Sequence, residues 1–254
     1  MSQPSTIKPM PFWLSSLFFG IPSAIGWLGV YVGLPALARA GVPLFWNSLL
    51  CIVGPLALML AAAFVAYQLE GHSLSWAGVR ARFRLKPLQG KEWFWTLGLC
   101  LVCPGTYFLL LPTARWLASI PLFAPPGFLP SLVRPDVSQV LPTEYLGVPL
   151  QGNWWLLLVH IGVLCFNIYG EELWWRGYIL PRQELVHGRW TWLIHGVQWT
   201  LFHSFWKWNL IAILPGAVAL SFVTSRLKNT TPGIVAHWAE NALGLVAILL
   251  GVIR

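Results

Sequence analysis

Three short groups of polar residues interrupt apolar stretches in the last 100 residues of this sequence. They are Glu171-Glu172-Leu-Trp-Trp-Arg176, Trp199-Thr-Leu-Phe-His203 and His237-Trp-Ala-Glu240-Asn241. Carboxylates and imidazoles can accept and return protons, and imidazole and amide groups can donate hydrogen bonds to a developing negative charge. The residue types therefore indicate a site for proton transfer in which an oxyanion is stabilised.

Helical spacing assigns different roles to the two adjacent glutamates. Glu172 and Arg176 are separated by four residues with the acid first, which is the favourable order for an ion pair on one helix face. Glu171 is rotated by about 100° from Glu172 and is left without the arginine. We therefore expect Glu172 to be structural and Glu171 to be the group that exchanges protons.

The histidines are interpreted in the same way. His237 and Asn241 are also four residues apart, so they should project from one helix face as two neighbouring hydrogen-bond donors. This arrangement suits a developing oxyanion. His203 is single on its segment, and only its occurrence together with the other two polar groups favours a catalytic role over a packed core histidine.

The composition shows what kind of structure must position these side chains. Of the 254 residues, 57% are hydrophobic and only 9% are charged, and the mean hydropathy is +0.66. A soluble domain carries about 25% charged residues. The sequence thus excludes a soluble enzyme, a disordered protein and a nucleic-acid binder, despite a net charge of +8. We expect one integral membrane domain over residues 1–254, with a catalytic core at about 150–250.

Apolar runs of about 20 residues, enough for one helical crossing of a bilayer, occur along the whole chain. The sequence predicts an all-α, polytopic bundle with about seven spans, at roughly 12–37, 43–69, 93–112, 153–180, 191–208, 209–225 and 233–252. The fifth and sixth are separated only by Lys207, Trp208 and Asn209, which favours a tight hairpin or a re-entrant pair. Segment 113–152 is rich in proline and is expected to be a loop, with an eighth span there as the alternative.

Basic residues predict the orientation of the bundle. With seven spans, ten lysines and arginines fall on the side of the N-terminus and five on the opposite side. The larger group is Lys8, Arg80, Arg82, Arg84, Lys86, Lys91, Arg182, Arg189, Arg226 and Lys228. The positive-inside rule then places the N-terminus in the cytoplasm. We expect a multi-pass protein, in a bacterial inner membrane.

The three polar groups together carry a family resemblance. Glu-Glu-x-x-x-Arg, aromatic-x-x-x-His and His-x-x-x-Asn, in this order on successive late helices, resemble the CAAX-protease and bacteriocin-processing family of intramembrane endopeptidases. That family includes the type II CAAX prenyl endopeptidase. The resemblance covers roughly residues 150–250. Two departures are Trp199, where the family more often has phenylalanine, and the family's usual eight spans.

The resemblance implies a reaction and a role for each matching residue. Glu171 matches the glutamate that activates water, with His203 assisting it. His237 and Asn241 match the pair that stabilises the oxyanion, and Glu172 and Arg176 match positions that brace the site. The implied reaction is hydrolysis of a peptide bond in a membrane-associated protein or peptide, in contact with the lipid bilayer and without nucleic acid.

Three alternatives remain open from the sequence. Glu171, His203 and His237 would also make a His₂Glu zinc set, but the sequence lacks the His-Glu-x-x-His helix of common zinc proteases, and we expect no metal or other cofactor. A non-proteolytic scaffold, or an immunity or regulatory protein on the same fold, would not need all six polar residues. A transporter would show broken helices in two related halves, whereas the polar residues here are confined to one half.

Overall fold

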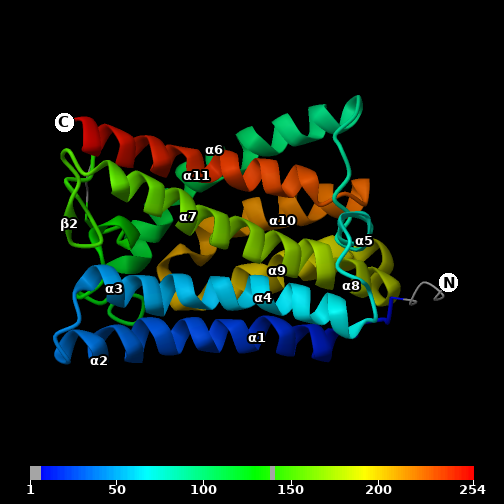
Figure 1. Cartoon of the computed structure of the whole chain (residues 1–254), viewed down its shortest axis with the longest axis horizontal. Helices are drawn as coiled ribbons and strands as arrows, with labels where there is room; N and C mark the ends of the chain where they lie inside the picture. Colours follow the sequence, from blue (N-terminus) through cyan, green and yellow to red (C-terminus); the bar gives the residue numbers. More distant parts are fainter. Residues whose placement is uncertain (1–6, 138–140) are drawn as a thin grey trace.

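Helices form nearly all the regular structure in the computed structural model, which describes residues 7–137 and 141–254 (Figure 1). The expectation of an all-helical fold is confirmed. Five helical segments are long and apolar enough to span a membrane: Phe12–Arg39, Leu44–Leu69, Lys91–Ala118, Trp154–Leu227 and Thr231–Ile253. The fourth has 74 residues and contains several helices. The expected count of seven or eight crossings therefore stays a prediction.

The first two segments form a helical hairpin, and each contains a short π-helical stretch. They comprise α1 (Phe12–Leu28), η1 (Gly29–Gly33) and α2 (Leu34–Arg39), then α3 (Leu44–Ser48), η2 (Leu49–Val53) and α4 (Gly54–Leu69). The turn between them uses Gly41, whose φ of 79° is readily adopted by glycine. The side chain of Asn47 donates to the carbonyl of Leu34 at 2.8 Å and so ties the two segments together.

A short helix and a basic connection lead to the third segment. Helix α5 (Trp76–Arg82) is capped by Ser75, whose hydroxyl accepts from the amide of Gly78 at 3.1 Å. Helix α6 (Lys91–Ala118) then runs the length of the bundle and continues past the expected end at residue 112. Its prolines, Pro104 and Pro112, lie inside the helix without ending it.

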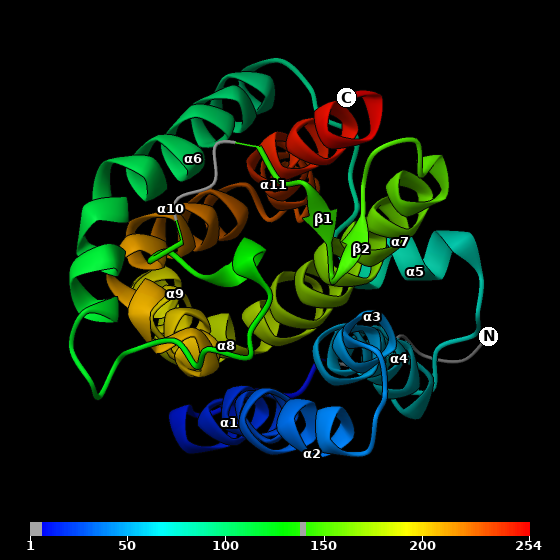
Figure 2. The same cartoon turned by 90° about the vertical axis from the view of Figure 1, so that its left-hand side faces the viewer.

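The proline-rich segment after α6 covers one end of the bundle, as the end-on view shows (Figure 2). Its described residues contain a single 3₁₀ turn, η3 (Ser131–Val133), and a hairpin of β1 (Glu144–Tyr145) and β2 (Val148–Pro149), but no helix long enough for an eighth span. Tyr145 contacts His160 through a hydrogen bond of 3.1 Å between its hydroxyl and Nδ1. Burial raises the pKa of Tyr145 to about 12, so this hydroxyl stays protonated.

The C-terminal half starts with one continuous helical run that changes its pitch in the middle. It comprises α7 (Trp154–Glu171), the π-helix η4 (Glu172–Ile179) and α8 (Leu180–His187). The remaining elements are η5 (Gly188–Trp190), α9 (Thr191–Phe202), η6 (His203–Asn209), α10 (Leu210–Leu227) and α11 (Thr231–Ile253). The expected helix at 191–208 is therefore shorter than predicted, because the chain turns at His203.

Helices α9 and α10 pack against each other as a hairpin joined by the 3₁₀ turn η6. Inside this turn Trp206 has φ −105° and ψ 51°, which breaks the helical path. Twelve residues of α-helix are about 18 Å long, well short of the ~30 Å apolar core of a bilayer. Helix α9 thus ends at His203, whose side chain is only 14% exposed.

Two carboxylates hold together the end of the bundle at which α1 begins. Glu70 pairs with Arg82 at 2.5 Å and with Arg182 at 3.4 Å. Glu184 pairs with Arg84 at 2.9 Å and with Lys228 at 2.8 Å. Each carboxylate thereby binds cations from distant parts of the chain. The pairs also show that basic residues expected on one side of the membrane do lie at one end of the bundle.

The outer faces of the long helices are strongly apolar. Phe94, Leu101 and Leu109 on α6 are each about 75% exposed. A large apolar surface in water would favour aggregation, so these faces fit contact with lipid chains. The protein is an integral membrane protein.

Candidate active site

The two adjacent glutamates lie where α7 passes into the π-helix η4, near the middle of the run Trp154–His187. Gly170 precedes them at a close crossing with α4: a Cβ placed there would meet the carbonyl oxygen of Leu56 at 2.6 Å. The lack of a side chain at Gly170 therefore lets the backbone of α4 pack directly beneath the site. The glutamates diverge from this point.

Glu172 is buried in contact with polar side chains. Its Oε1 accepts from Nη1 of Arg176 at 2.9 Å, and both side chains are completely buried. The same oxygen is 3.1 Å from Nδ1 of His237 on α11. Gly233, one turn earlier on α11, lies so close that a Cβ would meet Oε2 of Glu172 at 2.5 Å. The ion pair expected from the spacing of Glu172 and Arg176 is thus present.

Glu171 points to α9 and has different partners. Its Oε2 accepts a hydrogen bond of 2.7 Å from the indole Nε1 of Trp199. Its Oε1 lies 3.9 Å from Nε2 of His203, and its side chain is 5% exposed. No lysine or arginine within residues 7–137 and 141–254 forms an ion pair with it. The structure therefore brings Glu171 and His203 together, and it adds Trp199 as a hydrogen-bond donor to the other carboxylate oxygen.

The ring of His203 is oriented by its own helix. Nδ1 lies 2.9 Å from the backbone carbonyl oxygen of Trp199. A carbonyl can only accept, so Nδ1 carries the hydrogen of this bond. In a neutral ring Nε2 is then an acceptor. Two acceptors, Nε2 of His203 and Oε1 of Glu171, consequently face each other across 3.9 Å, a separation that a bridging water suits.

His237 is bound on one side by a carboxylate. Because Glu172 accepts, Nδ1 of His237 carries a hydrogen, and its Nε2 can donate only if the ring is doubly protonated. The contact with Glu172 therefore fixes the orientation of the His237 ring, with Nε2 on the opposite side of the ring.

Asn241 and Glu240, in the third polar group, have interactions that helical spacing did not predict. The side chain of Asn241 donates from Nδ2 to the carbonyl of His237 at 3.0 Å, within its own helix. Only its second amide hydrogen is left for another acceptor. Glu240, to which the sequence analysis gave no role, is within electrostatic range of His237, Cys103 and Tyr107. A third carboxyl group therefore belongs to the edge of the site.

Trp199 is the contact that the sequence interpretation missed. The sequence analysis treats Trp199 only as an aromatic side chain that replaces phenylalanine. Tryptophan, unlike phenylalanine, has an N–H donor, and this donor is the feature of the sequence that could have predicted a hydrogen bond here. Its partner Glu171 is 28 residues away in the sequence, so no local spacing rule could predict the pair.

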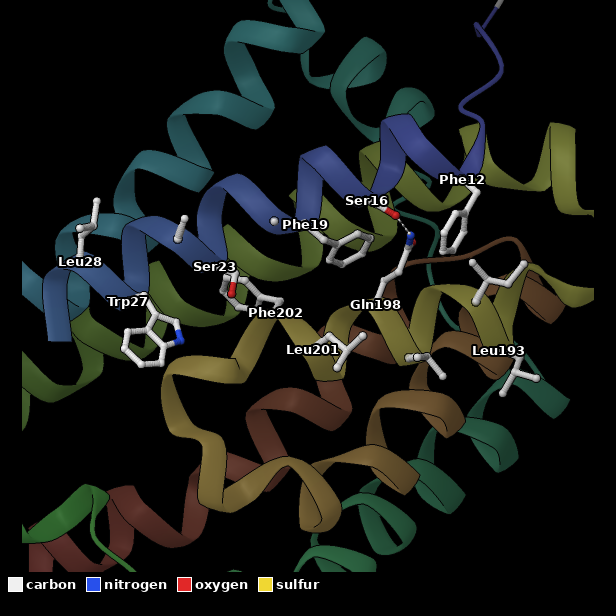
Figure 3. Close-up of a pocket in the computed structure, with 14 residues that line it drawn as sticks. Phe12, Ser16, Phe19, Ser23, Trp27, Leu28, Leu193, Gln198, Leu201 and Phe202 are labelled. Carbon is white, nitrogen blue, oxygen red and sulfur yellow. Dashed lines mark hydrogen bonds between the residues drawn. The ribbon is translucent and has the colours of Figure 1, made fainter. Parts of the chain in front are cut away.

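An apolar groove of about 810 Å³ lies between α1 and α9, and Phe202 is one of the residues that line it (Figure 3). Phe12, Phe19 and Trp27 line it from α1, and its few polar groups include Ser16 and Gln198, which are joined by a hydrogen bond of 3.0 Å. The ring of Phe202 is 4.8 Å from that of His203. The groove thus provides an apolar surface next to the candidate catalytic residues.

The alternative zinc set of Glu171, His203 and His237 stays an alternative. Across the described residues no three histidine, cysteine, aspartate or glutamate side chains are grouped closely enough to hold a metal ion in this conformation. Nδ1 of His237 contacts Glu172 and Nδ1 of His203 contacts a backbone carbonyl, so only Nε2 of each ring remains for another partner.

The comparison with known families agrees with the site. Residues 153–243 match the family described as type II CAAX prenyl endopeptidase Rce1-like, and this stretch contains all six candidate residues. The resemblance to the CAAX-protease and bacteriocin-processing family is confirmed over these 91 of 254 residues. This is a family of proteases. No curated protein and no solved structure matches the chain.

Proposed function

We propose that this protein is an intramembrane CAAX-type endopeptidase that hydrolyses a peptide bond by means of water activated by Glu171. The observation that carries the proposal is the environment of that carboxylate. It is buried, forms no ion pair with a lysine or arginine of the described residues, and faces the acceptor nitrogen of His203. A carboxylate that is not neutralised by a partner is free to take a proton.

In the proposed reaction a water lies between Glu171 and His203 and donates a hydrogen bond to each. Glu171 removes one proton while the water oxygen attacks the carbonyl carbon of the substrate. A C–O bond forms, and the carbonyl π electrons move to its oxygen, giving a tetrahedral oxyanion. General-base assistance of this kind contributes about 10²–10⁴-fold to a rate. No covalent enzyme intermediate is needed.

The oxyanion then requires donors, which we assign to His237 and to the second amide hydrogen of Asn241. Glu172 and Arg176 hold His237 in place, and the carboxylate of Glu172 favours its protonated form. Collapse of the intermediate breaks the C–N bond, and Glu171 returns its proton to the leaving amine. The products are a carboxylic acid, which keeps the second proton of the water until it loses it to solvent, and an amine, and the enzyme is restored.

The proposed substrate is a membrane-associated protein or peptide. The groove between α1 and α9 can take an apolar segment, because it is lined almost wholly by apolar side chains and adjoins His203 through Phe202. We further propose that the N-terminus is cytoplasmic, in a bacterial inner membrane, and that the reaction needs no metal.

The decisive experiment replaces the base and keeps its shape. Glu171→Gln protein, purified and reconstituted with a fluorogenic peptide of CAAX or leader-peptide sequence, should lose at least about 100-fold in kcat/KM. Glu144→Gln, a change at an exposed carboxylate of the end hairpin, is the matched control and should retain full activity. Equal activity of the Glu171→Gln and wild-type proteins would exclude the mechanism.

A further inference from the structure

Trp199 contacts four of the ionisable side chains of the candidate site: Glu171, His203, His237 and Arg176. Its indole donates to Glu171, and its ring meets the rings of His203 and His237 edge-on at centroid distances of 5.2 Å and 6.1 Å. The guanidinium carbon of Arg176 lies 3.7 Å from the ring centroid. One aromatic side chain therefore contacts both the candidate base, at its edge, and the cation, at its face.

The hydrogen bond from the indole is the only one in the described residues that ends on the carboxylate of Glu171. At 2.7 Å it is short for an N–H donor, in the range of bonds to charged acceptors. The glutamate side chain has three rotatable bonds, so no other hydrogen bond fixes the direction of its carboxylate here. Without the indole, its oxygens could turn away from His203.

The ring itself has little freedom to move. Arg176 stacks on one face, and Arg176 is in turn fixed by its ion pair with Glu172. Trp199 is only 5% exposed. The guanidinium contacts the ring and Glu172 and forms no ion pair with Glu171. The geometry gives Glu171 a firm hydrogen bond and leaves it free of an ion pair.

We infer that Trp199 is a positioning residue for Glu171: its indole N–H fixes the carboxylate in the orientation that faces His203. A purely structural tryptophan would need only its ring, whereas a positioning tryptophan needs its N–H. The kinetic consequence of this inference rests on the proposed function. The hydrogen bond itself can be tested without any substrate.

The kinetic test removes the donor and keeps a ring. Trp199→Phe should lower kcat by about 10- to 100-fold, the loss expected for a hydrogen bond to a charged group, with little change in KM because substrate contacts are retained. The control is Trp175→Phe, at a fully buried tryptophan that stacks on Phe19 and whose Nε1 has no partner in the described residues. This control should keep the wild-type kcat.

The spectroscopic test uses the indole N–H signals of the 17 tryptophans. In ¹⁵N-labelled protein, the cross peak absent from Trp199→Phe identifies Trp199, and Trp199→Tyr serves the same purpose if the first variant does not fold. We expect this peak to move when Glu171 is replaced by glutamine, because a neutral acceptor forms a weaker bond. The peak assigned from Trp175→Phe should not move.

The two tests separate this inference from the proposed function. If the wild-type protein cleaves nothing but the Trp199 peak responds to Glu171→Gln, the hydrogen bond stands and the proteolytic function falls. If the protein cleaves substrate and Trp199→Phe keeps the wild-type kcat, Trp199 only packs and the inference is wrong. An unmoved Trp199 peak in Glu171→Gln would also overturn it.

Discussion

Glu171 and Glu172 are neighbours in sequence, but they face two regions of the site with opposite physical character. The Glu172 region is sealed: the carboxylate, Arg176 and His237 are buried, and charges of opposite sign compensate each other. The Glu171 region has a single N–H donor, an acceptor nitrogen and no ion pair with lysine or arginine in the described chain.

The difference shows how a membrane protein can use two acidic residues in apolar surroundings for different roles. An uncompensated charge in the membrane interior is costly, by about 2.5–3.5 kcal/mol on insertion scales. The Glu172 region avoids this cost by pairing, so its acid serves the fold. Glu171 has no such partner, so the free-energy cost of its charge remains. Such a cost is expected of a group that takes part in proton transfer.

The largest loss of stability should come from breaking the ion pair in the Glu172 region. Glu172→Gln leaves Arg176 unpaired in the interior, and breaking a buried ion pair costs about 3–5 kcal/mol. The protein should give a lower yield and a clearly lower Tm in detergent. Glu171→Gln should change the free energy of unfolding by less than about 1 kcal/mol, because the glutamine oxygen still accepts from Trp199. Equal loss of stability in both variants would show that the Glu171 and Glu172 regions do not differ in this way.

A smaller loss of stability is expected from overpacking the Glu172 region while its charged side chains are kept. Gly233→Ala would place a methyl group 2.5 Å from Oε2 of Glu172, and overpacking of this kind costs about 1–3 kcal/mol. Gly244→Ala is the control on the same helix, because its methyl group meets only Nε2 of His160, at 4.0 Å. The control should be neutral or stabilising by up to about 1 kcal/mol. Thermal unfolding of the two variants, measured side by side, tests how tightly the region is packed.

The smallest expected effect is that of chelation. The Glu171 region should work without a metal, so prolonged treatment with a zinc chelator should leave kcat/KM unchanged, and elemental analysis should find zinc well below one atom per chain. Loss of activity that is restored by Zn²⁺ would contradict this. It would mean that Glu171, His203 and His237 move together to form a metal site.

Much of the site could be predicted from the sequence because its contacts are local. The pair of Glu172 and Arg176 depends only on helical spacing, and it forms even though the structure winds residues 172–179 as a π-helix. The all-helical fold follows from composition, since a bilayer requires backbone groups to be satisfied within each segment.

Contacts between helices could not be predicted, because they depend on how the helices turn about their axes. The hydrogen bond from Trp199 to Glu171 and the contact of His237 with Glu172 both join different helices. Spacing alone predicted that Asn241 would project beside His237. The structure shows why it does not suffice: a short amide side chain also finds an acceptor on its own backbone.

The pairs of Glu70 and Glu184 at the end of the bundle constrain the order in which the protein can be assembled. Arg82 and Arg84 emerge early in synthesis, but Arg84 finds its partner 100 residues later, and its backbone carbonyl is bound by the amide of Thr230. These two contacts of Arg84 therefore cannot form before residues 184 and 230 have been synthesised, so the basic connection reaches its full set of partners only when the C-terminal half is present.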